Sequence, residues 1–60
     1  MNEFKSNLVE IAAQIKGETP KAYRLFDGSK TEWVAKSQVE DNGDGTFSMP
    51  DWVAKEKGFI

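Results

Sequence analysis

The segment Lys21–Glu40, KAYRLFDGSKTEWVAKSQVE, decides the fold, because two β-prone runs lie on either side of Gly28-Ser29. A two-residue loop with glycine in first place is typical of a β-hairpin turn of type II′, and type I′ is the alternative. The register that this turn sets pairs Asp27 with Lys30, Phe26 with Thr31, Arg24 with Trp33 and Tyr23 with Val34. The sequence therefore predicts an antiparallel hairpin, whose second strand can continue to Glu40.

The residues that follow extend the predicted sheet and end in a helix. The run DNGDG at residues 41 to 45 has the composition of a turn, so TFSM at residues 46 to 49 is predicted to return as a third strand. Pro50 suits the first turn of a helix, and Gly58 suits its end. The sequence thus predicts a three-stranded antiparallel meander followed by a short helix of about two turns.

Residues 3 to 16, before the hairpin, carry a helical pattern. Their apolar side chains recur at the spacing of one helical stripe: Phe4, Leu8, Ile11, Ala12 and Ile15. Asn2 and Gly17 suit the two ends of such a helix. We therefore predict a single α+β domain over residues 1–60, in which an N-terminal helix packs on one face of the meander and a short C-terminal helix lies at its edge.

Side-chain alternation divides the predicted sheet into two faces. The more apolar face, expected to pack against the first helix, carries Ala22, Arg24, Phe26, Thr31, Trp33, Ala35, Ser37, Val39, Phe47 and Met49. The wetter face keeps a small apolar island, and we predict that it binds a protein partner, a host protein among the candidates. The residues of this predicted partner site are Tyr23, Leu25, Val34, Lys36 and Gln38. A β-bulge would flip part of this assignment, and a one-residue slip would reverse it.

Composition excludes several classes of site. The chain has 60 residues, a formal net charge of −2, and no cysteine or histidine. Disulfides, zinc sites of the usual kind and histidine-based acid–base catalysis are therefore excluded. A chain this short has little room for a closed catalytic cleft, so we expect no enzyme and no cofactor. No apolar run can span a membrane and the N-terminus does not have the pattern of a signal peptide, so we expect a cytoplasmic protein with no membrane partner.

The turn EDNGDGTF at residues 40 to 47 has a second interpretation, as a calcium loop. With Gly45 at position six of an EF-hand loop, oxygen ligands fall at the first, third, fifth and twelfth positions: Glu40, Asn42, Asp44 and Asp51. Glutamate at the first position is long for the tight turn, and aspartate at the twelfth reaches less well as a bidentate ligand. The alternative is a hairpin loop rich in residues that tolerate positive φ.

The two tryptophans, Trp33 and Trp52, also have two interpretations. One is core packing, with Arg24 lying against Trp33 as a cation–π pair. The other is base stacking, because single-strand binders combine aromatic side chains with basic ones, and Arg24, Lys21 and Lys36 fall near Trp33. The scattered basic residues and the negative net charge argue against strong nucleic-acid binding. A weak single-stranded nucleic-acid binder is therefore the alternative to a protein-binding module.

Residues 33 to 60 contain a pattern of residue types at defined spacings. Its members are Trp33, Val34, Ala35, Lys36, Ser37, Gln38 and Val39, then Asp44, Gly45 and Thr46, then Pro50, Asp51, Trp52, Val53 and Ala54, and last the six residues from Lys55 to Ile60. The pattern resembles one in uncharacterised small phage and prophage proteins and in short modules of phage proteins, some of which accompany recombination or DNA-handling genes. Ala35 stands where the pattern often has proline. The resemblance implies a phage-type accessory protein, and we expect a protein-interaction module, with a homodimer left open.

Overall fold

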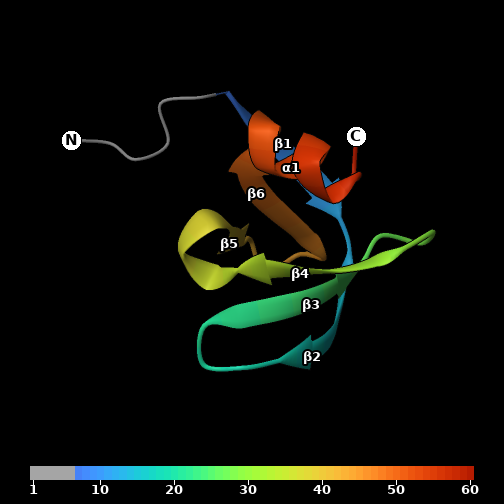
Figure 1. Ribbon diagram of the computed structural model, residues 1–60, viewed down its shortest axis with the longest axis vertical. Coiled ribbons are helices and arrows are strands. Elements are labelled where there is room, and N and C mark those ends of the chain that lie inside the picture. The colour runs from blue at the N-terminus through green and yellow to red at the C-terminus, as the bar shows by residue number, and fades with distance from the viewer. Residues whose placement is uncertain (1–6) are drawn as a thin grey trace.

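The structure is a computed structural model that describes residues 7–60, and it is mostly β (Figure 1). Two three-stranded antiparallel sheets, ordered β1-β6-β5 and β2-β3-β4, enclose one hydrophobic core. In chain order the elements are β1 (Leu8–Ala12), β2 (Gln14–Glu18), β3 (Ala22–Phe26), β4 (Thr31–Ala35), the 3₁₀ helix η1 (Lys36–Gln38), β5 (Glu40–Asp41), β6 (Thr46–Pro50) and α1 (Asp51–Lys57). The predicted fold, with an N-terminal helix on a meander, is therefore wrong.

The segment predicted as the N-terminal helix forms two strands instead. Residues 3 to 6, including Phe4, lie outside the described residues, but Leu8–Ala12 is β1 and Gln14–Glu18 is β2. The apolar residues of this segment also alternate, at Val9, Ile11, Ala13 and Ile15. Ile11 and Ala13 are buried, so the period of two, and not the helical period, describes how the segment meets the core.

β1 and β2 form one nearly continuous segment that serves both sheets. Ile11 in β1 pairs with Phe47 in β6, whereas Ile15 in β2 pairs with Leu25 in β3. Ala13, between the two strands, is buried, and its backbone N–H donates to the carbonyl oxygen of Gly45 at 3.1 Å. This hydrogen bond satisfies the backbone at the point where the chain passes from one sheet to the other.

The predicted hairpin is confirmed in its register. β3 and β4 pair as expected: Phe26 with Thr31, Arg24 with Trp33 and Tyr23 with Val34. Gly28 has a positive φ of 98° and Ser29 does not have a positive φ, which excludes the type I′ alternative, because that turn needs a positive φ at both central residues. The Asp27 backbone N–H donates to the carbonyl oxygen of Lys30 at 3.1 Å, which closes the turn.

The predicted faces of this hairpin are reversed. Leu25 and Val34, expected on the wet face, are fully buried, whereas Arg24 and Trp33 are exposed. The inner face packs against a second sheet instead of a helix. The 3₁₀ helix η1 then interrupts the alternation, so Val39 is buried as predicted although it has the opposite parity to Val34. The burial predicted for Phe47 and Met49 in the last strand is confirmed.

The predicted C-terminal helix is confirmed as α1, which packs on β1 and β6 through Val53 and Ala54 (Figure 1). Gly58 ends it in the left-handed conformation, with a φ of 79°. The Phe59 backbone N–H folds back and donates to the carbonyl oxygen of Ala54 at 2.8 Å. Within residues 7–60, no helix has the length and apolarity that a membrane crossing requires.

Candidate nucleic-acid interface

The outward side of the β2-β3-β4 sheet, here called the outer face, displays aromatic and basic side chains. Its central residues are Lys16, Gly17, Arg24, Phe26 and Trp33, and Gln14, Ala22, Thr31 and Ala35 complete it. Trp33 keeps 46% of its surface exposed, although it is one of the largest side chains in the chain. An exposed tryptophan that shares a face with other aromatic and basic side chains is typical of a surface that binds a partner.

The Trp33 indole lies across the sheet. Gly17, Arg24 and Trp33 stand in one row across β2, β3 and β4. A Cβ atom built on Gly17 would lie 3.4 Å from Cβ of Arg24 and 3.7 Å from Cη2 of Trp33. The indole from β4 therefore reaches over β3 towards β2, a span of about 10 Å for two strand spacings. The glycine leaves the room that this flat arrangement needs.

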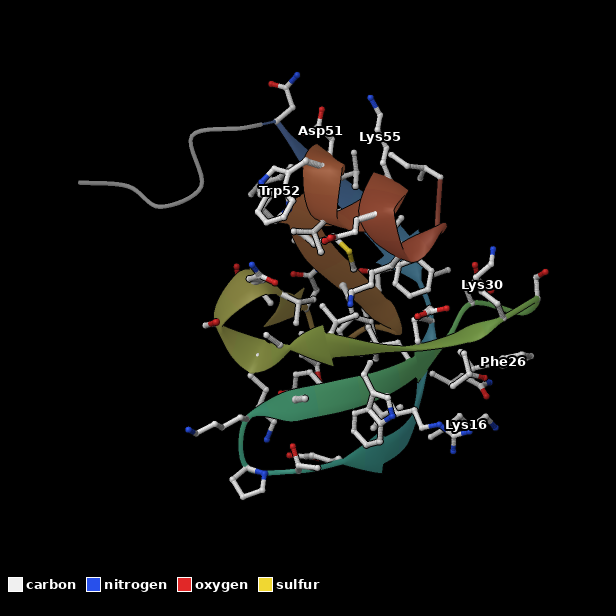
Figure 2. All side chains as sticks on the ribbon, in the orientation of Figure 1. Lys16, Phe26, Lys30, Asp51, Trp52 and Lys55 are labelled. Atoms are coloured by element: carbon white, nitrogen blue, oxygen red, sulfur yellow. The ribbon has the colours of Figure 1, made fainter. Side chains whose placement is uncertain are left out.

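The charge of the outer face is positive. A β-bulge between Ile15 and Gly17 inserts Lys16, whose Nζ lies 5.6 Å from the ring centroid of Phe26 (Figure 2). Arg24 supplies the second cation. None of the described residues that make up this face is an aspartate or a glutamate. A chain with a net charge of −2 thus carries a local basic patch beside its most exposed β-sheet aromatic side chain.

The predicted partner site does not form one exposed surface. Leu25 and Val34 are fully buried, so the expected apolar island is part of the core. Tyr23 packs towards Phe47, with ring centroids 6.0 Å apart, and Lys36 Nζ lies 4.9 Å from the centroid of its ring.

Lys36 also forms an ion pair with Glu18, so it lies away from Trp33. Gln38, the remaining member of the predicted site, is partly exposed in η1. Whether Tyr23, Lys36 and Gln38 contact a partner stays a prediction.

The proposed calcium ligands are used within their own turn or lie outside it. Asp44 Oδ1 accepts hydrogen bonds from the backbone N–H and the hydroxyl of Thr46, at 3.0 and 2.6 Å, and the Asn42 amide donates to Thr46 Oγ1 at 3.0 Å. Glu40 lies in β5, and Asp51 begins α1. Among residues 7–60, no three acidic, cysteine or histidine side chains are grouped to hold a metal ion. Residues 40 to 47 therefore form the hairpin turn between β5 and β6 and the ends of these two strands.

Two aspartates in turns are expected to make the free energy of unfolding depend on pH in the acidic range. The Lys30 and Ser29 backbone N–H groups lower the pKa of Asp27 below its ordinary value of 3.8, and the Thr46 hydroxyl and backbone N–H lower the pKa of Asp44. A lowered pKa in the folded chain adds stability that is present above 3.8 and is lost as the pH falls through the folded value.

We expect the free energy of unfolding of the wild type to fall below about pH 4, and to fall less in the double variant Asp27→Asn, Asp44→Asn. Urea unfolding at a series of pH values measures this, with Glu56→Gln on α1 as the charge control. An equally steep decline in the double variant would contradict the prediction.

Trp52, the second tryptophan, does not contribute to the outer face. It is 48% exposed and lies on α1, at the opposite end of the molecule from Lys16 and Phe26 (Figure 2). The two tryptophans therefore cannot stack neighbouring bases in one site, and Trp52 provides a matched control position for Trp33.

Sequence reasoning paired Arg24 with Trp33 but missed Lys16 and Phe26 as surface partners. The predicted fold, with a helix on a meander, places Phe26 in the core with Trp33 and Lys16 in the helix. The alternation from Val9 to Ile15 is the signal that could have indicated strands in place of the helix. Comparison with protein-family models, curated proteins and solved structures gave no match.

Proposed function

We propose that this chain is a small non-catalytic binding module, of the phage-accessory type that its sequence pattern resembles, and that its outer face binds single-stranded nucleic acid. The observation that carries the proposal is the exposed Trp33 indole, which reaches across the sheet towards Gly17 on the same face as the cations Arg24 and Lys16. Proteins that bind single strands without strong sequence preference use aromatic side chains to stack bases and basic side chains to hold phosphates.

The size of the outer face favours a nucleic-acid strand over a folded protein. Three strands of five residues cover about 10 Å by 17 Å, whereas a stable protein–protein interface buries about 800 Å² on each partner. A strand of a few nucleotides fits the smaller area. A protein partner is the alternative, and its interface would have to extend beyond this face, for example towards Tyr23 and Lys36.

Tryptophan fluorescence tests the proposal directly. In a Trp52→Phe variant, the emission reports Trp33 alone. Titration with an unstructured single-stranded oligonucleotide of about ten nucleotides at low salt is expected to quench it in a saturable way. A duplex of the same length is expected to quench it less, because its bases are already stacked. Absence of quenching by the single strand at low salt would overturn the proposal.

The salt dependence of the association constant is expected to report two phosphate contacts, one from each cation of the outer face. If Lys16 and Arg24 each contact one phosphate, the logarithm of the association constant should fall with the logarithm of salt concentration with a slope of about −1.4. Arg24→Gln or Lys16→Gln should each make the slope shallower by about 0.7. Lys55→Gln, on the exposed side of α1, is the matched control and should leave the slope unchanged. An unaltered slope in Arg24→Gln would place the phosphate contacts elsewhere.

A further inference from the structure

A cleft of about 340 Å³ lies beside Phe26, next to the outer face. Three segments that are distant in sequence line it: Ala12, Ala13 and Gln14 where β1 passes into β2, Phe26, Asp27 and Gly28 at the β3–β4 turn, and Gly45 at the β5–β6 turn. Only Gln14 and Asp27 bring polar side chains to a lining that is otherwise apolar or backbone. A concave, mainly apolar site with a few polar groups is the usual form of a small-ligand site.

The Asp27 carboxylate is held in place through one oxygen, and its other oxygen can still accept hydrogen bonds. Its Oδ1 accepts hydrogen bonds from the backbone N–H groups of Ser29 and Lys30, both at 2.8 Å. These bonds lower the pKa of Asp27, so the group is ionised near neutral pH and can only accept hydrogen bonds. Within residues 7–60, Oδ2 of Asp27 and the side-chain amide of Gln14 have no hydrogen-bond partner. The lining of the cleft therefore includes one residue with a fixed, free acceptor and one residue with an adaptable amide.

We propose that this cleft takes one base of a nucleic-acid strand bound on the outer face, and that it selects a base with an exocyclic amino group over uracil or thymine. The inference rests on the proposed function. The amino group of cytosine can donate to Oδ2 of Asp27 while the Gln14 amide donates to the ring nitrogen or carbonyl oxygen of the base. The corresponding position of uracil is a carbonyl oxygen, whose lone pairs would face the carboxylate.

Matched oligonucleotides of deoxycytidine and deoxyuridine test this contact, because the two bases differ only along one edge: cytosine has an amino group and an accepting ring nitrogen where uracil has a carbonyl oxygen and a ring N–H. At a pH above neutrality, where oligo(dC) stays single-stranded, we expect the wild type to bind oligo(dC) about tenfold more tightly than oligo(dU). Equal affinities would overturn the base preference and leave the proposed function standing. Binding of neither oligonucleotide would overturn both.

Asp27→Asn tests the residue itself. The substitution keeps an oxygen to accept from Ser29 and Lys30, so the turn is retained, and it replaces the free acceptor by a donor. The preference for oligo(dC) should be lost or reversed. Asp41→Asn is the matched control, because Asp41 also caps a turn, through Gly43, with the same charge, but does not line the cleft. A preference for oligo(dC) that survives in Asp27→Asn, or that Asp41→Asn removes equally, would overturn the inference.

Discussion

Replacing Trp33 with alanine is expected to weaken single-stranded oligonucleotide binding by about one to two orders of magnitude, because stacking on an aromatic side chain contributes about 1–3 kcal/mol per base. The free energy of unfolding should fall by no more than about 1 kcal/mol, since Trp33 lies on the exposed side of its sheet and 46% of its surface is in solvent. The indole reaches over Arg24 towards Gly17, so its removal also takes away the flat surface that a base would cover.

Trp52→Ala is the matched control for this prediction. Trp52 is as exposed as Trp33, at 48%, but it lies on α1. Fluorescence anisotropy of a labelled oligonucleotide measures both variants without relying on their own emission. We expect Trp52→Ala to bind like the wild type. If the two variants lost affinity equally, or if Trp33→Ala bound normally, the outer face would not be the binding surface.

Replacing Leu25 with alanine is expected to leave the chain largely unfolded. Leu25 is fully buried in the core together with Val34 and Met49. Truncating a buried leucine to alanine destabilises a protein by about 2–5 kcal/mol, and a domain of this size has only a few kcal/mol to lose. The loss should appear in far-UV circular dichroism at 25 °C, or as a urea midpoint close to zero.

Leu8→Ala is the same chemical change at an exposed position and provides the control. Leu8 begins β1 with 50% of its surface in solvent, so we expect a shift in the free energy of unfolding of about 0.5 kcal/mol or less. Similar stabilities for the two variants would contradict the inward orientation of Leu25. A Leu25→Ala variant as stable as the wild type would agree with the sheet faces expected from the sequence alone.

The hairpin was predictable because its signal is local. Gly28 sets the turn, the turn sets the register, and the register pairs Arg24 with Trp33 regardless of what covers the sheet. The C-terminal helix was predictable for the same reason, since Pro50 and Gly58 mark its ends within a few residues. Neither of these sequence signals depends on residues that are distant in the chain.

The N-terminal strands were not predictable on these grounds, because the segment satisfies two periods at once. Leu8, Ile11 and Ile15 fit a helical stripe, while Val9, Ile11, Ala13 and Ile15 alternate. The choice between them is made by β6 and β3, which hydrogen-bond to this segment from later in the chain. Strand preference depends on such tertiary contacts more than helix preference does.

The wrong prediction of the N-terminal helix also explains why the exposure of the candidate site was not predicted. Counting apolar side chains favoured the face with Phe26 and Trp33 as the core, which is reasonable for a sheet that a long helix covers. A second small sheet instead encloses a narrow core that Leu25 and Val34 complete. Lys16 joined the site only because the β-bulge of β2 places it beside Phe26. The site thus depends on β2, which the sequence analysis predicts as part of a helix.

The passage of one segment through Ala13 into both sheets makes their stabilities inseparable. β1 pairs with β6 near the other end of the described chain, and β2 pairs with β3 in the hairpin. Opening either pairing frees one end of a segment whose other end holds the second sheet, and exposes the core that both share. We therefore expect that the two sheets do not act as independent folding units, and that the chain passes between folded and unfolded states in a single cooperative transition.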